Sequence, residues 1–177
     1  MKVDWKNITI KNLDAIVCHE LTRGDIDAVL VGGACVSIYT DNSYVSYDLD
    51  FVSHSSLKDI AGILSGLGFK RESSRHFIRK DCPFFIEFVA PPVSVGNEAI
   101  KKEETIDTPH GRLRLLTPTD SVKDRLAAYY HWNDPQAREQ AVMVPRAQKV
   151  KITEIRKWSE KEGHNEKFDA FLKILKA

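Results

Sequence analysis

Apolar residues early in the chain follow the spacing of strands in three places. Residues 29–31 are apolar and largely β-branched, which predicts a buried strand. Residues 47–53 alternate between apolar and polar positions and predict a second strand. The run at residues 83–89, which is apolar apart from one acid, predicts a third.

Helical spacing separates these strands. Apolar residues recur every three or four positions at residues 13–21, and Gly24 is a suitable end for that helix. A short helix is expected over residues 34–39 and a longer one over residues 57–67. Strands interleaved with helices predict an α/β core, which we place at residues 1–116.

Helical spacing dominates residues 117–177, for which we expect a C-terminal helical bundle beside the core. Thr117 and Pro118 predict the first helix start, with threonine as N-cap and proline in the first turn. The later helices are expected over residues 135–148, 152–162 and 165–176. Residues 93–106 carry no clear period, and their run of lysine and glutamate is typical of a surface loop.

Composition excludes several classes of protein. Charged residues make up 29% of the 177 residues but the net charge is only +1, so no global basic field marks a nucleic-acid binder. No apolar run has the length of a membrane span, and the first residues lack a signal peptide's apolar segment. The three cysteines match neither a disulfide framework nor a zinc site, so we expect reduced thiols in a cytoplasmic protein.

Candidate chemistry begins at Gly32-Gly33, where a glycine turn opens a short helix and suits an anion such as phosphate. A plain tight turn is the alternative. Asp48 and Asp50 lie two residues apart on a strand, so they share a face at a separation of roughly 7 Å. Two carboxylates so placed can hold a divalent metal. In the alternative interpretation they form the solvated face of an edge strand.

Glu87 lies in the middle of an otherwise apolar strand. A carboxylate buried there without a partner would cost several kcal/mol or become protonated. A metal shared with Asp48 and Asp50 would remove this difficulty. The alternatives are an edge-strand charge or an ion pair with an arginine such as Arg79.

Together, a strand, Gly-Gly, a short helix and a strand with Asp-x-Asp resemble the signature of the nucleotidyltransferase superfamily that includes DNA polymerase β. The resemblance implies a mixed sheet with flanking helices. It also implies Mg²⁺ or Mn²⁺ held by Asp48, Asp50 and Glu87. The phosphates of an NTP would then lie against Gly32 and Gly33.

Residues 122–134 narrow the resemblance, because they are similar to the helical motif of AbiEii-type abortive-infection and toxin nucleotidyltransferases. The similarity implies that Lys123 contacts the nucleotide's phosphates and that Asp134 supports the site. The family's usual Arg-Asp is Asn133-Asp134 here. Lys123 as a solvated helix lysine, and Asp134 as the N-cap of the next helix, are the alternatives.

The expected activity is metal-dependent transfer of a nucleoside monophosphate from an NTP to a hydroxyl. The acceptor could be RNA such as tRNA, a protein or a small molecule. The second resemblance implies a toxin-like role with an antitoxin protein as partner, and no membrane partner is expected. The alternative is a catalytically inactive binding or regulatory protein of the same fold, against which the three retained acids argue.

Overall fold

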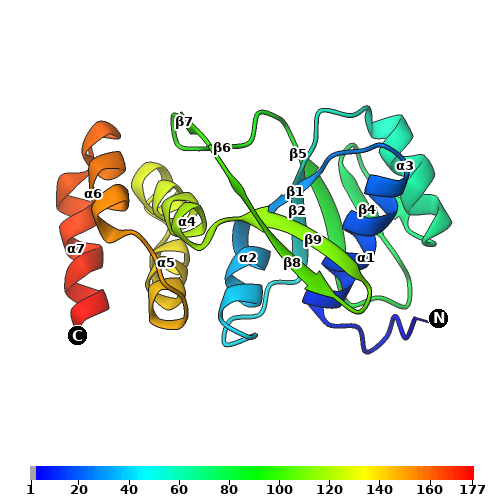
Figure 1. Ribbon diagram of the computed structural model, residues 1–177, viewed down its shortest axis with the longest axis horizontal. Helices are drawn as coiled ribbons and strands as arrows, with labels where there is room; N and C mark the ends of the chain where they lie inside the picture. Colours follow the sequence, from blue (N-terminus) through cyan, green and yellow to red (C-terminus); the bar gives the residue numbers. More distant parts are fainter. Residues whose placement is uncertain (1–2) are drawn as a thin grey trace.

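Seven strands form the main sheet of the computed structural model, which describes residues 3–177 (Figure 1). The first two residues of the expected core therefore lie outside the described part. The strand order is β3-β4-β5-β2-β1-β9-β8, and only the β1–β9 and β2–β5 pairs are parallel. The strands are β1 (Val29–Val31), β2 (Asp48–Val52), β3 (Lys70–Arg71), β4 (His76–Ile78), β5 (Phe85–Val89), β8 (Glu103–Thr108) and β9 (Gly111–Leu116). This mixed sheet with flanking helices confirms the expected α/β fold class.

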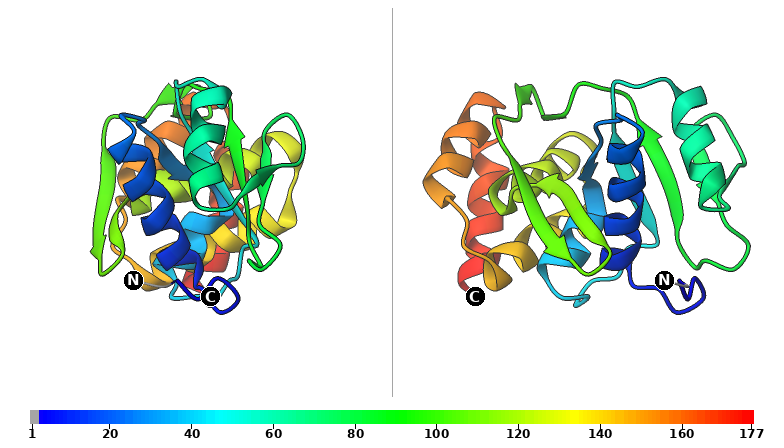
Figure 2. Two further views of the ribbon diagram at one scale, coloured as in Figure 1. Left: turned by 90° about the vertical axis from the view of Figure 1, so that its right-hand side faces the viewer. Right: turned by 45° about the vertical axis from the view of Figure 1, so that its right-hand side comes forward.

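Helices lie beside the sheet and at one end of the molecule. Figure 2 shows α1 lying along the sheet, where it packs against β9 and contacts α3. In Figure 1, α4 and α5 lie between α2 and the outer pair α6 and α7. The helices are α1 (Ile10–Arg23), α2 (Gly32–Tyr39), α3 (Leu57–Gly66), α4 (Pro118–Trp132), α5 (Pro135–Ala147), α6 (Ile152–Lys161) and α7 (Asn165–Lys176).

Local capping signals confirm several predicted helix starts. The Thr117 side chain accepts a hydrogen bond from the Asp120 backbone N–H, and Pro118 occupies the first turn of α4. Asp134 caps α5 by accepting from the backbone N–H groups of two residues in its first turn. Because each cap satisfies amides that have no partner within the helix, these boundaries follow from local sequence.

The expectation of a surface loop over residues 93–106 is wrong. This segment forms the small hairpin β6 (Ser94–Val95) and β7 (Glu98–Ala99), followed by β8, which pairs with β9. Arg114 on β9 holds Glu103 across the pair, with Nη2 and Oε2 2.8 Å apart. Part of the charged run therefore lies on β8, an edge strand, where charged side chains discourage pairing with a further strand.

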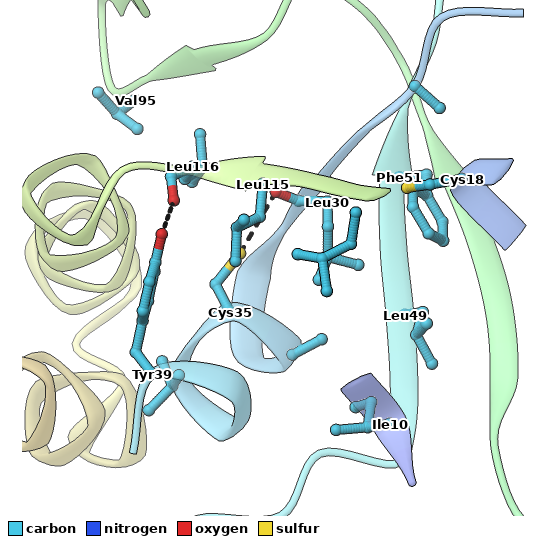
Figure 3. Close-up of a cluster of buried hydrophobic side chains, with 14 of the residues drawn as sticks. Ile10, Cys18, Leu30, Cys35, Tyr39, Leu49, Phe51, Val95, Leu115 and Leu116 are labelled. Carbon is cyan, nitrogen blue, oxygen red and sulfur yellow. Dashed lines mark hydrogen bonds between the residues drawn. The ribbon is translucent and has the colours of Figure 1, made fainter. Parts of the chain in front are cut away.

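Two polar contacts link α2 to the sheet within the apolar core (Figure 3). The Tyr39 hydroxyl donates to the Leu116 carbonyl at 2.6 Å, and the Cys35 thiol contacts the Leu30 carbonyl at 3.3 Å. Burial raises the pKa of both side chains, so they stay neutral. The cysteines are free thiols, and no helix of residues 3–177 has both the length and the apolar character to cross a membrane.

Candidate active site

Two neighbouring strands bring the three predicted acids to one face of the sheet. Register pairs Asp50 on β2 with Glu87 on β5, and Asp48 lies two residues before Asp50. Leu49 and Phe51 point the other way and are fully buried in the core. Because β2 lies between β1 and β5, the edge-strand interpretation of Asp48 and Asp50 is wrong.

The three acids line a cavity of about 480 Å³ on this face. Its other lining residues include Gly32 at the start of α2 and residues of α4. We call this space the acid cavity, and the lining residues that matter below are Gly32, Asp48, Asp50, Glu87, Asp124 and Arg125. It lies between the sheet and the helical part of the chain, and both contribute to its wall.

Asp50 has the most perturbed environment in the acid cavity. Burial is the main cause that raises its pKa to about 7, and the negative charges of Asp48 and Glu87 raise it further. Arg125 opposes the shift but does not cancel it. Excess negative charge in a partly buried site indicates a place for a cation.

The glycine pair leaves room for the acids. Gly32 has a φ of +73°, and a Cβ there would lie 2.6 Å from Asp50 Oδ2. A Cβ on Gly33 would lie 3.3 Å from the Ser46 hydroxyl, which donates to Asp48 Oδ1 at 2.5 Å. The pair also begins α2 two residues earlier than expected, so it is the first turn of a helix rather than a plain turn.

Within residues 3–177, no group of three or more histidine, cysteine, aspartate or glutamate side chains is already arranged around a metal position. Glu87 Oε2 lies instead 2.8 Å from His76 Nε2, and Asp48 is held by Ser46. Arg79, the other partner considered for Glu87, pairs with Asp81. The donors are nevertheless all carboxylate oxygens, which suit Mg²⁺ or Mn²⁺, and the raised pKa of Asp50 shows the charge that such an ion would neutralise.

Lys123 does not line the acid cavity. Its side chain is only 1% exposed, and its Nζ lies 2.9 Å from Glu154 and 3.2 Å from Asp120. Burial alone would lower the pKa of Lys123, but these two carboxylates raise it. Because its side chain is buried among carboxylates, Lys123 is not a solvated lysine either. It lines a separate cavity of about 440 Å³ beside α6.

Asp134 also lies away from the predicted cluster, because its carboxylate caps α5. Oδ1 accepts from the backbone N–H groups of Gln136 and Ala137 at 2.9 and 3.1 Å. It does not contribute to the lining of the acid cavity. The structure therefore brings together Gly32, Asp48, Asp50 and Glu87, with Gly33 behind them.

Arg125 is the cavity residue that the sequence analysis missed. Its guanidinium donates to Asp124 Oδ2 from Nε at 2.9 Å and to Gln140 Oε1 from Nη1 at 3.3 Å. Residues two apart on a helix point in different directions, so Arg125 faces the cavity while Lys123 faces α6. The sequence carried no signal for which of these faces meets the sheet.

His76 and Ser46 were missed for a different reason. Each acts through a contact that depends on strand pairing or on a loop, His76 across the β4–β5 pair and Ser46 from the segment before β2. His76 is 11 residues from Glu87 in sequence. Ser46 is only two residues before Asp48, but it lies outside the strand, where the alternation of β2 does not place its side chain. Both orient carboxylates of the acid cavity.

The fold is similar to that of solved nucleotidyltransferase-like proteins. No family model matches the sequence, and no curated protein matches it. Among solved structures, an antigenic nucleotidyltransferase-like protein from Paracoccidioides brasiliensis superposes with a TM-score of 0.52 at 15% identity, covering 76% of this chain and 74% of that chain.

Two structures of the antibiotic-resistance factor ANT(2'')-Ia are also similar to this chain. Its solution structure has a TM-score of 0.53 at 11% identity and covers 94% of each chain. Its crystal structure in complex with adenylyl-2''-tobramycin has a TM-score of 0.53 at 10% identity, covering 91% of this chain and 97% of that one. At such low identity the similarity establishes the fold.

Proposed function

We propose that this chain is a metal-dependent nucleotidyltransferase that moves a nucleoside monophosphate from an NTP to a hydroxyl. The observation that carries the proposal is the acid cavity. Asp48, Asp50 and Glu87 share one sheet face, their mutual repulsion helps to raise the pKa of Asp50 to about 7, and the first turn of α2 lies against them.

Asp48, Asp50 and Glu87 would hold Mg²⁺ or Mn²⁺ in this proposal. Bound there, the ion would neutralise charge on the triphosphate and on the leaving pyrophosphate. Glu87 would complete this metal site or accept the proton of the attacking hydroxyl, with His76 Nε2 orienting its carboxylate from 2.8 Å.

The phosphates would approach the start of α2, where Gly32 and Gly33 carry no side chains of their own and lie against Asp50 and Ser46. Backbone N–H groups at a helix start favour anions, so α2 would add to the attraction. Arg125 supplies the fixed positive charge in the acid cavity and takes the phosphate role that the sequence suggested for Lys123. Lys123 and Asp134 would then stabilise the helical part of the chain. We propose that this part spans residues 117–177 and lies beside a core of residues 1–116.

The acceptor and the biological role form the finer part of the proposal. The AbiEii-type similarity of residues 122–134 supports an RNA or protein acceptor, a toxin-like role and an antitoxin partner. The presence of adenylyl-2''-tobramycin in one similar structure supports a small-molecule acceptor. One observation favours an inactive regulatory protein instead. The carboxylates of Asp48, Asp50 and Glu87 do not converge on one metal position.

Label transfer tests the proposal. The protein is incubated with Mg²⁺ or Mn²⁺, cellular RNA and each NTP, labelled either at the α- or at the γ-phosphate. Nucleotidyl transfer must label the acceptor from the α-position only and release the γ-label as pyrophosphate. The Asp48→Asn/Asp50→Asn double variant is the control. If this variant transferred the label as fast as the wild type, the result would contradict the proposal.

A further inference from the structure

The acid cavity continues along α4 into a second hollow of about 380 Å³. Ser94, Asp124 and Arg125 line both spaces, so the two adjoin, and we call the two spaces together the groove. The hollow lies between the β6–β7 turn and the second half of α4, and Trp132 lines its far end. We call it the Trp132 pocket.

Trp132 is unusually open for its type. Its exposed fraction is 76%, higher than that of the other exposed large hydrophobic side chains, such as Tyr47 at 62%. A single exposed apolar residue needs no explanation by itself. This one, however, borders a groove that leads to the acid cavity.

The end of α4 that presents Trp132 is held firmly. Lys167 on α7 donates from Nζ to the Tyr130 carbonyl and to Asn133 Oδ1, each at 2.6 Å. The ring of His131 packs edge-on against Trp132, with centroids 6.0 Å apart, and its Nε2 lies 3.5 Å from Glu162. A surface that is ordered before binding loses little entropy when a ligand arrives.

The chemistry of the Trp132 pocket favours a flat, uncharged ring. Of the described residues, those that line it include Asp124, Arg125 and His131 but no lysine, whereas five lysines line the cavity around Lys123. A polyanionic backbone therefore finds little attraction here. An exposed indole, by contrast, is a stacking surface for any nucleobase.

We propose that Trp132 is a stacking platform for a nucleobase, a subsite that rests on the proposed nucleotidyl transfer. Seven residues of helix separate Arg125 from Trp132, a rise of roughly 10 Å. A nucleotide can span this length with its phosphates in the acid cavity and its base on the indole. The base belongs either to the NTP or to an RNA acceptor.

Binding measurements distinguish these sources. Titrations in the presence of Mg²⁺ use each NTP, single-stranded oligoadenylate, and inorganic tripolyphosphate, which carries charge but no base. Trp132→Ala should weaken the binding of at least one base-containing probe by roughly 5- to 150-fold, the usual range for a lost stacking contact. Tripolyphosphate affinity should not change, and Trp132→Phe should retain part of the binding.

Tryptophan fluorescence gives an independent readout, since Trp158 is only 2% exposed and Trp5 lies beneath Arg79, 4.4 Å from its ring centroid. The probe that stacks should quench the wild type and Trp5→Phe but not Trp132→Ala. A loss confined to the NTPs assigns the base of the substrate, and a loss confined to oligoadenylate assigns the base of the acceptor.

Unchanged affinities for every base-containing probe in Trp132→Ala would overturn the platform, as would quenching by tripolyphosphate equal to that by an NTP. Failure of the transfer chemistry is recognised separately. In that case tripolyphosphate with Mg²⁺ does not bind the wild type, or binds the Asp48→Asn/Asp50→Asn variant equally well.

Discussion

Asp50 lies at the point where the sheet, α2 and α4 meet, and its carboxylate experiences the field of all three. Burial is the main cause that raises its pKa, the three acids Asp48, Glu87 and Asp124 raise it further, and Arg125 lowers it. Asp48 and Glu87 each have a side-chain partner in the fold, Ser46 and His76. At the residue scale, the acid cavity is a set of oriented carboxylates with more negative charge than Arg125 can balance.

Asp50 contributes to the pH dependence of stability. A free aspartate has a pKa of about 4, so between about pH 4 and pH 7 the folded protein holds this proton more firmly than the unfolded chain does. The contribution of Asp50 to the free energy of unfolding should therefore fall as pH rises through this window, by at most about 1.4 kcal/mol per pH unit. Buried Asp14, whose pKa is raised to about 8, adds a decline of its own.

Urea unfolding at several pH values without metal measures this effect. Asp50→Asn should show a shallower decline than the wild type. Asp107→Asn, which changes an exposed aspartate paired with Arg112, should behave like the wild type. Equal slopes in Asp50→Asn and the wild type would show that Asp50 titrates normally.

Gly32→Ala tests the close approach of α2 to Asp50. The φ of +73° and the 2.6 Å approach to Asp50 Oδ2 both oppose a side chain, so the variant should lose about 1–2 kcal/mol and transfer more slowly. Gly62→Ala is the matched control, because it lies inside α3 with open space around it and should gain up to about 1 kcal/mol. Equal stability of the two variants would contradict the account.

At the element scale, helix α4 uses two of its faces for different contacts. One carries Lys123 towards Glu154 and α6, and the other carries Arg125 into the acid cavity. The helix thus joins the helical part to the sheet by a buried ion cluster on one side and lines the proposed site on the other.

Substitutions on these two faces should separate stability from binding. Lys123→Met removes the buried cation that three carboxylates share, so it should cost roughly 3 kcal/mol of stability while the affinity of the folded protein for NTP stays unchanged. Arg125→Gln should weaken NTP affinity by roughly 1–3 kcal/mol. Calorimetric titration and urea unfolding measure the two quantities. The reverse outcome would restore Lys123 to the nucleotide site.

Sequence reasoning succeeded where the determining interactions are local. Thr117 and Asp134 have their effects within a few residues, so the starts of α4 and α5 followed from the chain itself. It failed for β8, because the charged run becomes a strand only by pairing with β9. It also failed for Arg125, since the face of α4 that meets the sheet is set by packing between distant segments.

At the scale of the whole molecule, the sheet and the helical part are joined on two sides. Gln148 at the end of α5 donates from Nε2 to the Tyr39 carbonyl at 2.9 Å. On the other side the β6–β7 turn is tied to α6, where the Asn97 backbone N–H donates to Glu162 at 2.9 Å and Trp158 Nε1 donates to the Val95 carbonyl at 3.1 Å. The hairpin thereby keeps Ser94 in the wall of the groove.

The central claim is that the acid cavity binds a divalent metal together with a nucleoside triphosphate. Mn²⁺ provides the most direct test, because the free ion is counted by its electron paramagnetic resonance signal. The protein is titrated with Mn²⁺ beside an α,β-methylene analogue of each NTP, which binds without transfer. Because the analogue itself binds Mn²⁺, depletion is counted beyond that caused by the analogue alone. The wild type and Asp107→Asn should show this further depletion of free Mn²⁺, and Asp48→Asn/Asp50→Asn, with an unchanged circular dichroism spectrum, should not. Equal depletion by the double variant, or none by the wild type with any analogue, would contradict the account.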